Sequence, residues 1–195
     1  MVASSLEGNI MEKAVFLDRD GTIVEDTGHL HERDKVRFLP GVDKAIRLLK
    51  ENGFKVIIVT NQAGVAKGYY TEDTVREMNA YVLGLLAKEG AIIDAVYYCP
   101  HHAEGVVEQY REACYCRKPN PGMLKQAATD FGIDFSQSFV IGDHLTDIEA
   151  GRQVGCQTIL LAAELSNHQN ESTPKPDYVA HNLYEAVKWL LKIKS

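Results

Sequence analysis

The sequence lacks a long hydrophobic run, has no surplus of basic residues, and contains only four cysteines among 195 residues. A membrane-spanning helix needs about 20 consecutive apolar residues, so membrane insertion is excluded. A net charge of -6 excludes broad nucleic-acid binding, because such binding needs a basic surface that displaces counterions. No basic segment followed by an apolar one opens the chain, so we expect no secretion signal and a cytoplasmic protein.

The remaining composition is ordinary, with 45% hydrophobic and 25% charged residues. These values are near the averages of globular proteins and argue against disorder or a fibrous repeat. A chain of this length can bury one hydrophobic core without disulfide bonds. We expect residues 11–195 to form a single domain that acts as a monomer, and residues 1–10 to be a weakly ordered extension.

Short apolar segments alternate with stretches of helical period, which is typical of βαβ units. Strands are predicted at 14–17, 54–59, 92–98, 138–141, 157–161 and 178–180. Helices are predicted from 42 to Asn52-Gly53, at 71–88, 121–131 and 147–154, and from about 182. The pattern predicts an α/β fold with a Rossmann-like, doubly wound, mostly parallel sheet. The polar loop from Glu164 to Lys175 is expected to be mobile.

Polar side chains follow several predicted strands. The first strand runs into Asp18 and Asp20, the second into Thr60 and Asn61, and the fourth into Asp143. Ligands of such sheets bind outside the carboxyl ends of the strands. This edge of the sheet is therefore the expected site.

The two carboxylates of Asp18 and Asp20 would repel each other in a cleft unless a cation or a proton relieved the repulsion, and a divalent metal is the natural answer. Asp18 can attack phosphorus and form an aspartyl phosphate. Asp20 can protonate the departing oxygen and later deprotonate the attacking water. Asp143 is a plausible further ligand, and oxygen ligands suit magnesium. Thr60 and Lys118 can supply the donors and positive charge that phosphoryl transfer requires.

Three of the cysteines lie in Cys99-Pro-His101-His102 and Cys114-Tyr-Cys116, and twelve residues separate His101 from Cys114. Thiolate and imidazole ligands match the tetrahedral preference of zinc, and four protein ligands indicate a structural site. A disulfide is the alternative, but a reducing compartment disfavours it. Bound zinc would order the loop over residues 99–116 and fix the segment that follows it.

The ordered series Asp18-x-Asp20-Gly-Thr, Val-Thr60-Asn, Lys118 and Gly-Asp143-x-x-x-Asp147 resembles the motifs of haloacid-dehalogenase-like phosphatases. The resemblance implies a magnesium-dependent phosphoric monoester hydrolase with an aspartyl-phosphate intermediate. Asp147 is left out of the expected site, because an aspartate in the first turn of a helix is commonly a capping residue.

The Cys-Pro-His-His loop that ends in Cys-x-Cys-Arg-Lys-Pro narrows the resemblance. It is similar to the branch that holds the D-glycero-D-manno-heptose 1,7-bisphosphate phosphatases and the histidinol-phosphate phosphatases, and its longer spacer favours the heptose enzymes. The implied reaction is hydrolysis of the C7 phosphate to heptose 1-phosphate in the biosynthesis of nucleotide-activated heptose for lipopolysaccharide core or another surface glycan. Histidinol phosphate or another small metabolite is the alternative substrate.

The family resemblance also implies roles for individual residues. Asp18 is the nucleophile, Asp20 the proton donor, and Thr60 and Lys118 hold the transferred group. Magnesium is implied at Asp18, the Asp20 carbonyl and Asp143, and zinc at Cys99, His101, Cys114 and Cys116, with His101 preferred over His102. The implied substrate contacts are Asp26, Thr27, Gly28, His29, Thr60, Asn61, Gln62, Ala63, Arg117, Lys118 and His144.

Three further features qualify these expectations. His144 stands where the family pattern has lysine, and Lys67 where it has arginine, so the preference for one anomer stays open. Only about 20 residues separate Asp20 from Pro40, which leaves no room for a large cap domain and implies a small substrate. A phosphate-receiving signalling domain would use similar groups, but its phosphorylated aspartate follows a middle strand.

Overall fold

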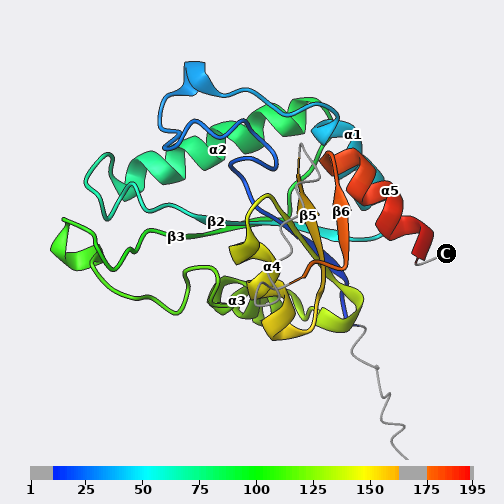
Figure 1. Ribbon diagram of the computed structural model, residues 1–195. Coiled ribbons are helices and arrows are strands. Elements are labelled where there is room, and N and C mark those ends of the chain that lie inside the picture. The colour runs from blue at the N-terminus through cyan, green and yellow to red at the C-terminus, as the bar shows by residue number, and fades with distance from the viewer. Residues whose placement is uncertain (1–10, 163–174, 194–195) are drawn as a thin grey trace, which may run out of the picture.

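The computed structural model describes residues 11–162 and 175–193. Within these ranges six strands form one sheet in the order β3-β2-β1-β4-β5-β6, and every neighbouring pair is parallel (Figure 1). The strands are β1 (Ala14–Leu17), β2 (Lys55–Asn61), β3 (Ala95–Cys99), β4 (Phe139–Gly142), β5 (Gln157–Leu161) and β6 (Tyr178–Ala180). The predicted α/β architecture is confirmed. The expectations for residues 1–10 and for the loop at 164–174 lie outside the described residues.

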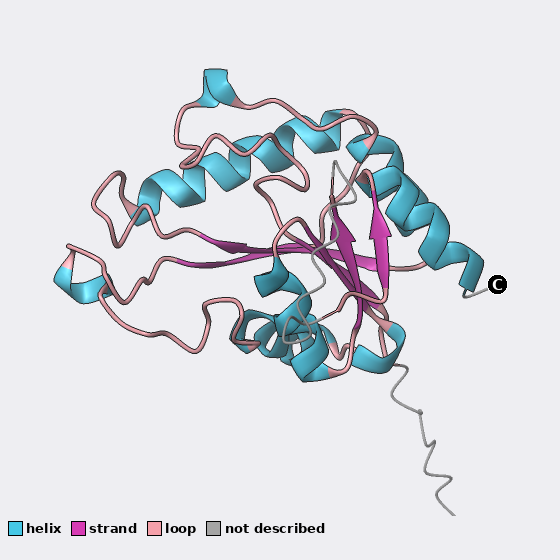
Figure 2. Ribbon diagram, viewed as in Figure 1, coloured by secondary structure: helices cyan, strands magenta, loops and turns pink. Residues whose placement is uncertain are grey.

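Helices cover both faces of the sheet (Figure 2). The helices α1 (Val42–Glu51), α2 (Glu72–Lys88) and α5 (Leu183–Ile193) pack on one face, and α3 (Gly122–Phe131) and α4 (Leu145–Val154) pack on the other. Strand β1 supplies both cores, with Val15 and Leu17 facing one and Ala14 and Phe16 facing the other. Successive side chains of a strand point to opposite faces, so a strand buried on both sides is apolar throughout.

Two predicted starts differ from the structure by two residues or more. Helix α4 begins at Leu145, because the carboxylate of Asp147 accepts a hydrogen bond from the His144 N–H at 3.1 Å and caps the helix. Strand β3 begins at Ala95, three residues after the predicted start at Ile92. Just before this start, the carboxylate of Asp94 accepts a hydrogen bond from the backbone N–H of Val56 at 2.7 Å.

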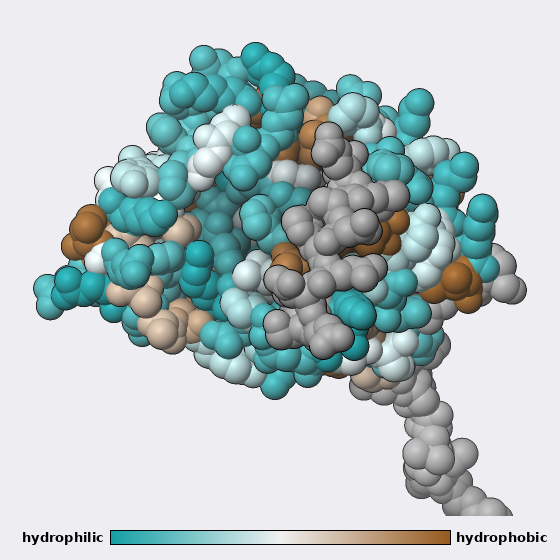
Figure 3. Space-filling view, in the orientation of Figure 1, coloured by the Kyte–Doolittle hydropathy of each residue, from teal (hydrophilic) through white to brown (hydrophobic). Residues whose placement is uncertain are grey.

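A long irregular segment joins β3 to α3 and includes one short 3-10 turn, Glu108–Tyr110. It projects beyond the sheet beside the β2–α2 connection (Figure 1). The face shown in Figure 3 is mostly hydrophilic, with hydrophobic residues in separate small groups. No helix in the described ranges combines the length and apolar character of a membrane span.

Candidate active site

Strand β1 lies between β2 and β4, where the strand order reverses. This is the position at which parallel sheets bind ligands. A pocket of about 280 Å³ opens there, and the loops after β1, β2 and β4 contribute to its wall. Its lining residues are Asp18, Asp20, Asp26, Gly28, Thr60, Asn61, Arg117, Lys118, His144, Thr146 and Asp147.

Asp18 and Lys118 form a buried ion pair at the base of this pocket. The Lys118 Nζ donates to Asp18 Oδ1 at 2.7 Å and to the carbonyl oxygen of Val59 at 2.7 Å. Asp18 is 8% exposed and Lys118 is 4% exposed. Burial raises the pKa of Asp18 to about 7, although Lys118 opposes that shift. The ammonium therefore lies beside the carboxylate expected to attack phosphorus.

Asp147 is a site residue that the sequence reasoning leaves out. Its Oδ1 lies 2.5 Å from the Nζ of Lys118, and the residue is buried. Burial alone would lower the pKa of Lys118, but Asp147 and Asp18 outweigh it and raise that pKa. Asp147 therefore both caps α4 and neutralises the charge of Lys118. The signal in the sequence was the second aspartate of Gly-Asp143-x-x-x-Asp147.

Asp18 and Asp143 are suited to a divalent cation. With His144 and Asp147 they can bring one ligand atom each to within 4.8 Å of one another. Gly21 has a φ of +80°, and a Cβ there would lie 2.0 Å from Oδ2 of Asp143. Only glycine at position 21 leaves room for the Asp143 carboxylate to approach this turn, so the turn after β1 and Asp143 can lie together in the site. Carboxylates with room for water are typical ligands of magnesium.

His144 follows Asp143 at the mouth of the pocket. Its Nδ1 lies 3.0 Å from Asp143 Oδ1, and this contact raises the pKa of His144 to about 9. The side chain is largely exposed. It lines the pocket as expected of a substrate contact.

The remaining predicted substrate contacts divide into two groups. Asp26 and Gly28 line the pocket, and Asp26 Oδ1 accepts the Gly28 N–H at 2.7 Å. Thr27, His29, Gln62 and Ala63 are not among the lining residues. Burial, with nearby Lys67, lowers the pKa of His29, which favours the neutral imidazole. The ring instead packs against Tyr69, with centroids 4.8 Å apart.

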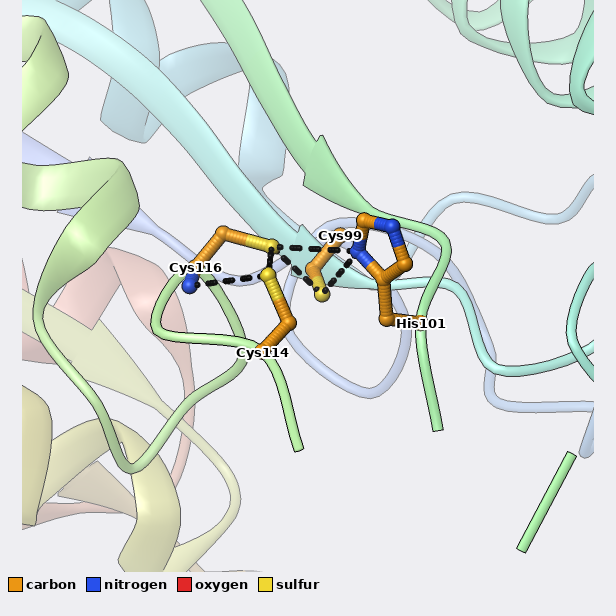
Figure 4. A group of neighbouring side chains, drawn as sticks. All are labelled: Cys99, His101, Cys114 and Cys116. Atoms are coloured by element: carbon orange, nitrogen blue, oxygen red, sulfur yellow. Dashed lines mark hydrogen bonds between the residues drawn. The ribbon is translucent and has the colours of Figure 1, made fainter. Parts of the chain in front are cut away.

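The predicted zinc ligands come together as a compact cluster (Figure 4). The Nδ1 of His101 lies 3.7 Å from the sulfur of Cys99 and 3.6 Å from that of Cys116. These two N···S separations are near those of a tetrahedron with Zn–S of about 2.3 Å and Zn–N of about 2.0 Å, whereas the sulfur–sulfur separations of 2.7 and 2.8 Å are shorter than that tetrahedron requires. Cys114 Sγ lies 2.7 Å from Cys116 Sγ, and all three cysteines are free rather than bridged. His102 turns away and accepts the Glu104 N–H through its own Nδ1.

The cluster can present a thiolate near neutral pH. The hydrogen bond from the Cys116 thiol lowers the pKa of Cys99 to about 6. Zinc binds the thiolate form of cysteine, so the donor set fits this metal. The cluster immediately precedes Arg117, whose Nη1 donates to the His101 carbonyl at 3.3 Å.

Comparisons with known proteins agree with this geometry. The haloacid dehalogenase-like hydrolase family model matches residues 15–134, and a second HAD-hydrolase-like model matches residues 115–186. The D-glycero-beta-D-manno-heptose-1,7-bisphosphate 7-phosphatase of Haemophilus influenzae is 40% identical over 184 residues, which cover 94% of this chain and 100% of that protein. The enzyme of the same name from Escherichia coli K12 is 41% identical and covers 87% and 89% of the two chains.

A solved structure shows the same fold. The D,D-heptose 1,7-bisphosphate phosphatase of B. bronchiseptica, complexed with magnesium and phosphate, aligns with a TM-score of 0.80 and 29% identity. The alignment covers 93% of this chain and 99% of that one. From the family model and the relatives together, the chain belongs to the haloacid dehalogenase-like phosphatases, in the family of the D-glycero-D-manno-heptose 1,7-bisphosphate 7-phosphatases.

Proposed function

We propose that this enzyme removes the C7 phosphate of D-glycero-β-D-manno-heptose 1,7-bisphosphate and releases heptose 1-phosphate and inorganic phosphate. The observation that carries the proposal is the buried Asp18–Lys118 pair in the pocket, within a chain that shares 40% identity with a named phosphatase over nearly its whole length. The product would feed the synthesis of nucleotide-activated heptose for a surface glycan. We propose that the enzyme acts as a monomer.

In the first half-reaction, a carboxylate oxygen of Asp18 attacks phosphorus and forms an aspartyl phosphate. The bond between phosphorus and the C7 oxygen breaks, and its electron pair leaves with that oxygen, which takes a proton from Asp20. In the second half-reaction, Asp20 accepts a proton from a water molecule that attacks phosphorus. Asp18 then leaves as a carboxylate, and inorganic phosphate is released.

The surrounding residues stabilise charge during both half-reactions. Lys118 faces the attacking carboxylate, and the Thr60 hydroxyl lies at the carboxyl end of β2 in the same pocket. Magnesium held by Asp18, the Asp20 carbonyl and Asp143 would neutralise phosphate charge when bound. Fixed charges and donors of this kind account for most of the catalysis of phosphoryl transfer.

Recognition of the substrate is proposed for the rim of the pocket. The planar guanidinium of Arg117 suits the sugar or the phosphate at C1. Asp26, Gly28 and His144 line the same pocket and can contact sugar hydroxyls. Zinc bound to the cluster at residues 99–116 would keep the segment with Arg117 and Lys118 in place.

The substrate is tested by measuring phosphate release, with magnesium present, from both anomers of heptose 1,7-bisphosphate and from histidinol phosphate. We expect the highest kcat/KM for the β anomer. An Asp18→Asn sample, prepared identically, controls for contaminating phosphatases. A higher kcat/KM for histidinol phosphate would contradict the proposed substrate.

A further inference from the structure

The carboxylate of Asp20 is held by donors from two neighbouring residues. Arg19 donates twice, from Nε to Oδ1 at 3.1 Å and from Nη2 to Oδ2 at 2.8 Å. Gln62 Nε2 donates to the same Oδ2 at 3.0 Å. A bidentate guanidinium and a third donor together restrict the direction in which a carboxylate points.

Arg19 is itself fixed by helix α2. The residue is 1% exposed, and its Nη1 donates to Oδ1 of Asn79 at 2.8 Å. Asn79 is 7% exposed and lies on α2 between Met78 and Val82, whose side chains belong to the apolar core. A buried polar side chain is normally hydrogen-bonded, and the side chain of Asn79 bonds to the arginine that holds Asp20.

Gln62 is fixed in the same way from another side. The hydroxyl of Tyr70 donates to Gln62 Oε1 at 3.1 Å, and Gln62 Nε2 also donates to Thr60 Oγ1 at 2.9 Å. Because the Tyr70 hydroxyl donates to the amide oxygen of Gln62, the amide nitrogen of Gln62 is the atom that faces Asp20. A Cβ at Gly64 would lie 2.3 Å from Cζ of Tyr70, so glycine leaves the space that the tyrosine ring occupies.

We propose that Asn79 and Tyr70 are positioning residues for phosphoryl transfer, which act through Arg19 and Gln62 to fix the carboxylate of Asp20. Neither residue is among those that line the pocket in the described chain. The inference rests on the proposed function, in which Asp20 exchanges protons with the leaving group and with water. We call Arg19, Gln62, Tyr70 and Asn79 the Asp20 clamp.

The proposal is tested first with two substitutions of Asn79. Asn79→Leu removes the acceptor for Arg19, whereas Asn79→Asp keeps a side-chain oxygen at the same place. We expect Asn79→Leu to lower kcat on the heptose bisphosphate by about ten- to a hundredfold, as for partial loss of general acid–base catalysis, and to change KM less than about twofold. Asn79→Asp should recover most of kcat.

A second measurement separates positioning from simple destabilisation. Beryllium trifluoride with magnesium occupies the place of the phosphoryl group on an aspartate, and fluorine NMR detects the adduct. Asn79→Leu should form this adduct with the affinity of the wild type, because Asp18 and Lys118 are unchanged. Val82→Ala, one turn further along α2 and buried in the core, controls for lost packing and should keep the wild-type kcat.

Tyr70→Phe tests the other side of the Asp20 clamp if Asn79→Leu does not fold. Without the hydroxyl, the Gln62 amide can turn its oxygen toward Asp20, so kcat should again fall while adduct affinity stays. Values of kcat within about twofold of wild type for every variant that folds, with Asp20→Asn inactive, would overturn the positioning role and leave the proposed function standing. Full activity of Asp20→Asn would instead refute the proposed function on which it rests.

Discussion

Asn61 and Lys118 hold each other through two hydrogen bonds across 57 positions of sequence. The Oδ1 of Asn61 accepts the backbone N–H of Lys118 at 3.0 Å, and its Nδ2 donates to the Lys118 carbonyl at 3.0 Å. The end of β2 is thereby joined to the segment that carries Lys118. Asn61 lines the pocket, but its amide is occupied by the backbone of Lys118.

Asn61→Ala should therefore loosen the lysine segment. Leaving two backbone groups of Lys118 without partners should lower the free energy of unfolding by about 1–3 kcal/mol. The kcat should fall with it, because the ammonium is no longer held beside Asp18. Chemical denaturation and steady-state kinetics measure the two effects. Unchanged stability together with a raised KM would show that Asn61 serves the substrate alone.

Asp147→Asn separates the two roles of Asp147. The asparagine oxygen can still accept the His144 N–H and cap α4, but it cannot neutralise Lys118. We expect the free energy of unfolding to fall by about 3 kcal/mol, because breaking a buried ion pair leaves an uncompensated charge. Thermal and denaturant unfolding of Asp147→Asn beside Asp147→Ala measures it. If Asp147→Asn is as stable and active as the wild type, the only role of Asp147 is to cap α4.

Much of the fold follows from local sequence pattern. Apolar runs such as Ala14–Leu17 predict strands buried on both faces, and the alternation with helical stretches predicts the parallel sheet. In a parallel sheet, the carboxyl ends of β1, β2 and β4 lie at the same edge, whichever face each helix covers. For this reason Asp18, Thr60 and Asp143 could be placed at one edge from the chain alone.

Other parts of the site depend on contacts that pattern does not encode. The pairing of Lys118 with Asp147 depends on how the N-terminus of α4 meets the segment before α3. The motif predicts Gln62 as a substrate contact, and only the structure shows that this residue is 2% exposed and that its amide nitrogen donates to Asp20. Nothing in the sequence distinguishes Asn79 from other polar residues of a helix, because its role depends on the contact with Arg19. Such roles require side-chain directions in three dimensions.

Asp18→Asn should abolish turnover, because an amide is not a nucleophile toward phosphorus. The loss in kcat should exceed about a thousandfold, as for removal of a residue that takes part in every bond-forming step. Rapid quench with radiolabelled substrate should trap a phosphoenzyme in the wild type and none in the variant. Asp43→Asn, on the surface of α1, is a matched control that should keep full activity. Turnover of Asp18→Asn near that of the wild type would exclude a covalent role.

Cys114→Ser should weaken or abolish zinc binding at the cluster. A hydroxyl is a poor zinc ligand, so native mass spectrometry should show zinc in the wild type and its loss in the variant. The segment that follows should exchange amide hydrogens faster, which mass spectrometry of peptides covering Arg117 and Lys118 measures. Cys156→Ser, at a buried cysteine outside the cluster, controls for loss of a thiol. Equal zinc content in all three proteins would refute the assignment.

Strand β3 and the loop over residues 99–116 are also attached to α2 through Glu72. Its Oε1 accepts the hydroxyl of Tyr98 at 2.7 Å and its Oε2 that of Tyr110 at 2.8 Å. These hydrogen bonds lower the pKa of Glu72 below its ordinary value of 4.5. The folded state thus favours the charged carboxylate, and its contribution to stability is fully present above the pKa of the unfolded chain.

Glu72→Gln should therefore destabilise the protein in a pH-dependent way. At pH 7 the loss should be about 1–2 kcal/mol, since two charge-assisted hydrogen bonds become neutral and the side chain is 29% exposed. The difference between wild type and variant should shrink as the pH falls through the lowered pKa of Glu72, where the wild-type carboxyl also becomes neutral. Urea denaturation of both proteins from pH 7 to about 3.5 measures this difference and cancels effects that they share, such as loss of metal. Glu77→Gln, at an exposed position of the same helix, is the control, and its stability relative to the wild type should not change with pH in this way. An equal pH dependence in Glu77→Gln and Glu72→Gln would rule out the proposed attachment.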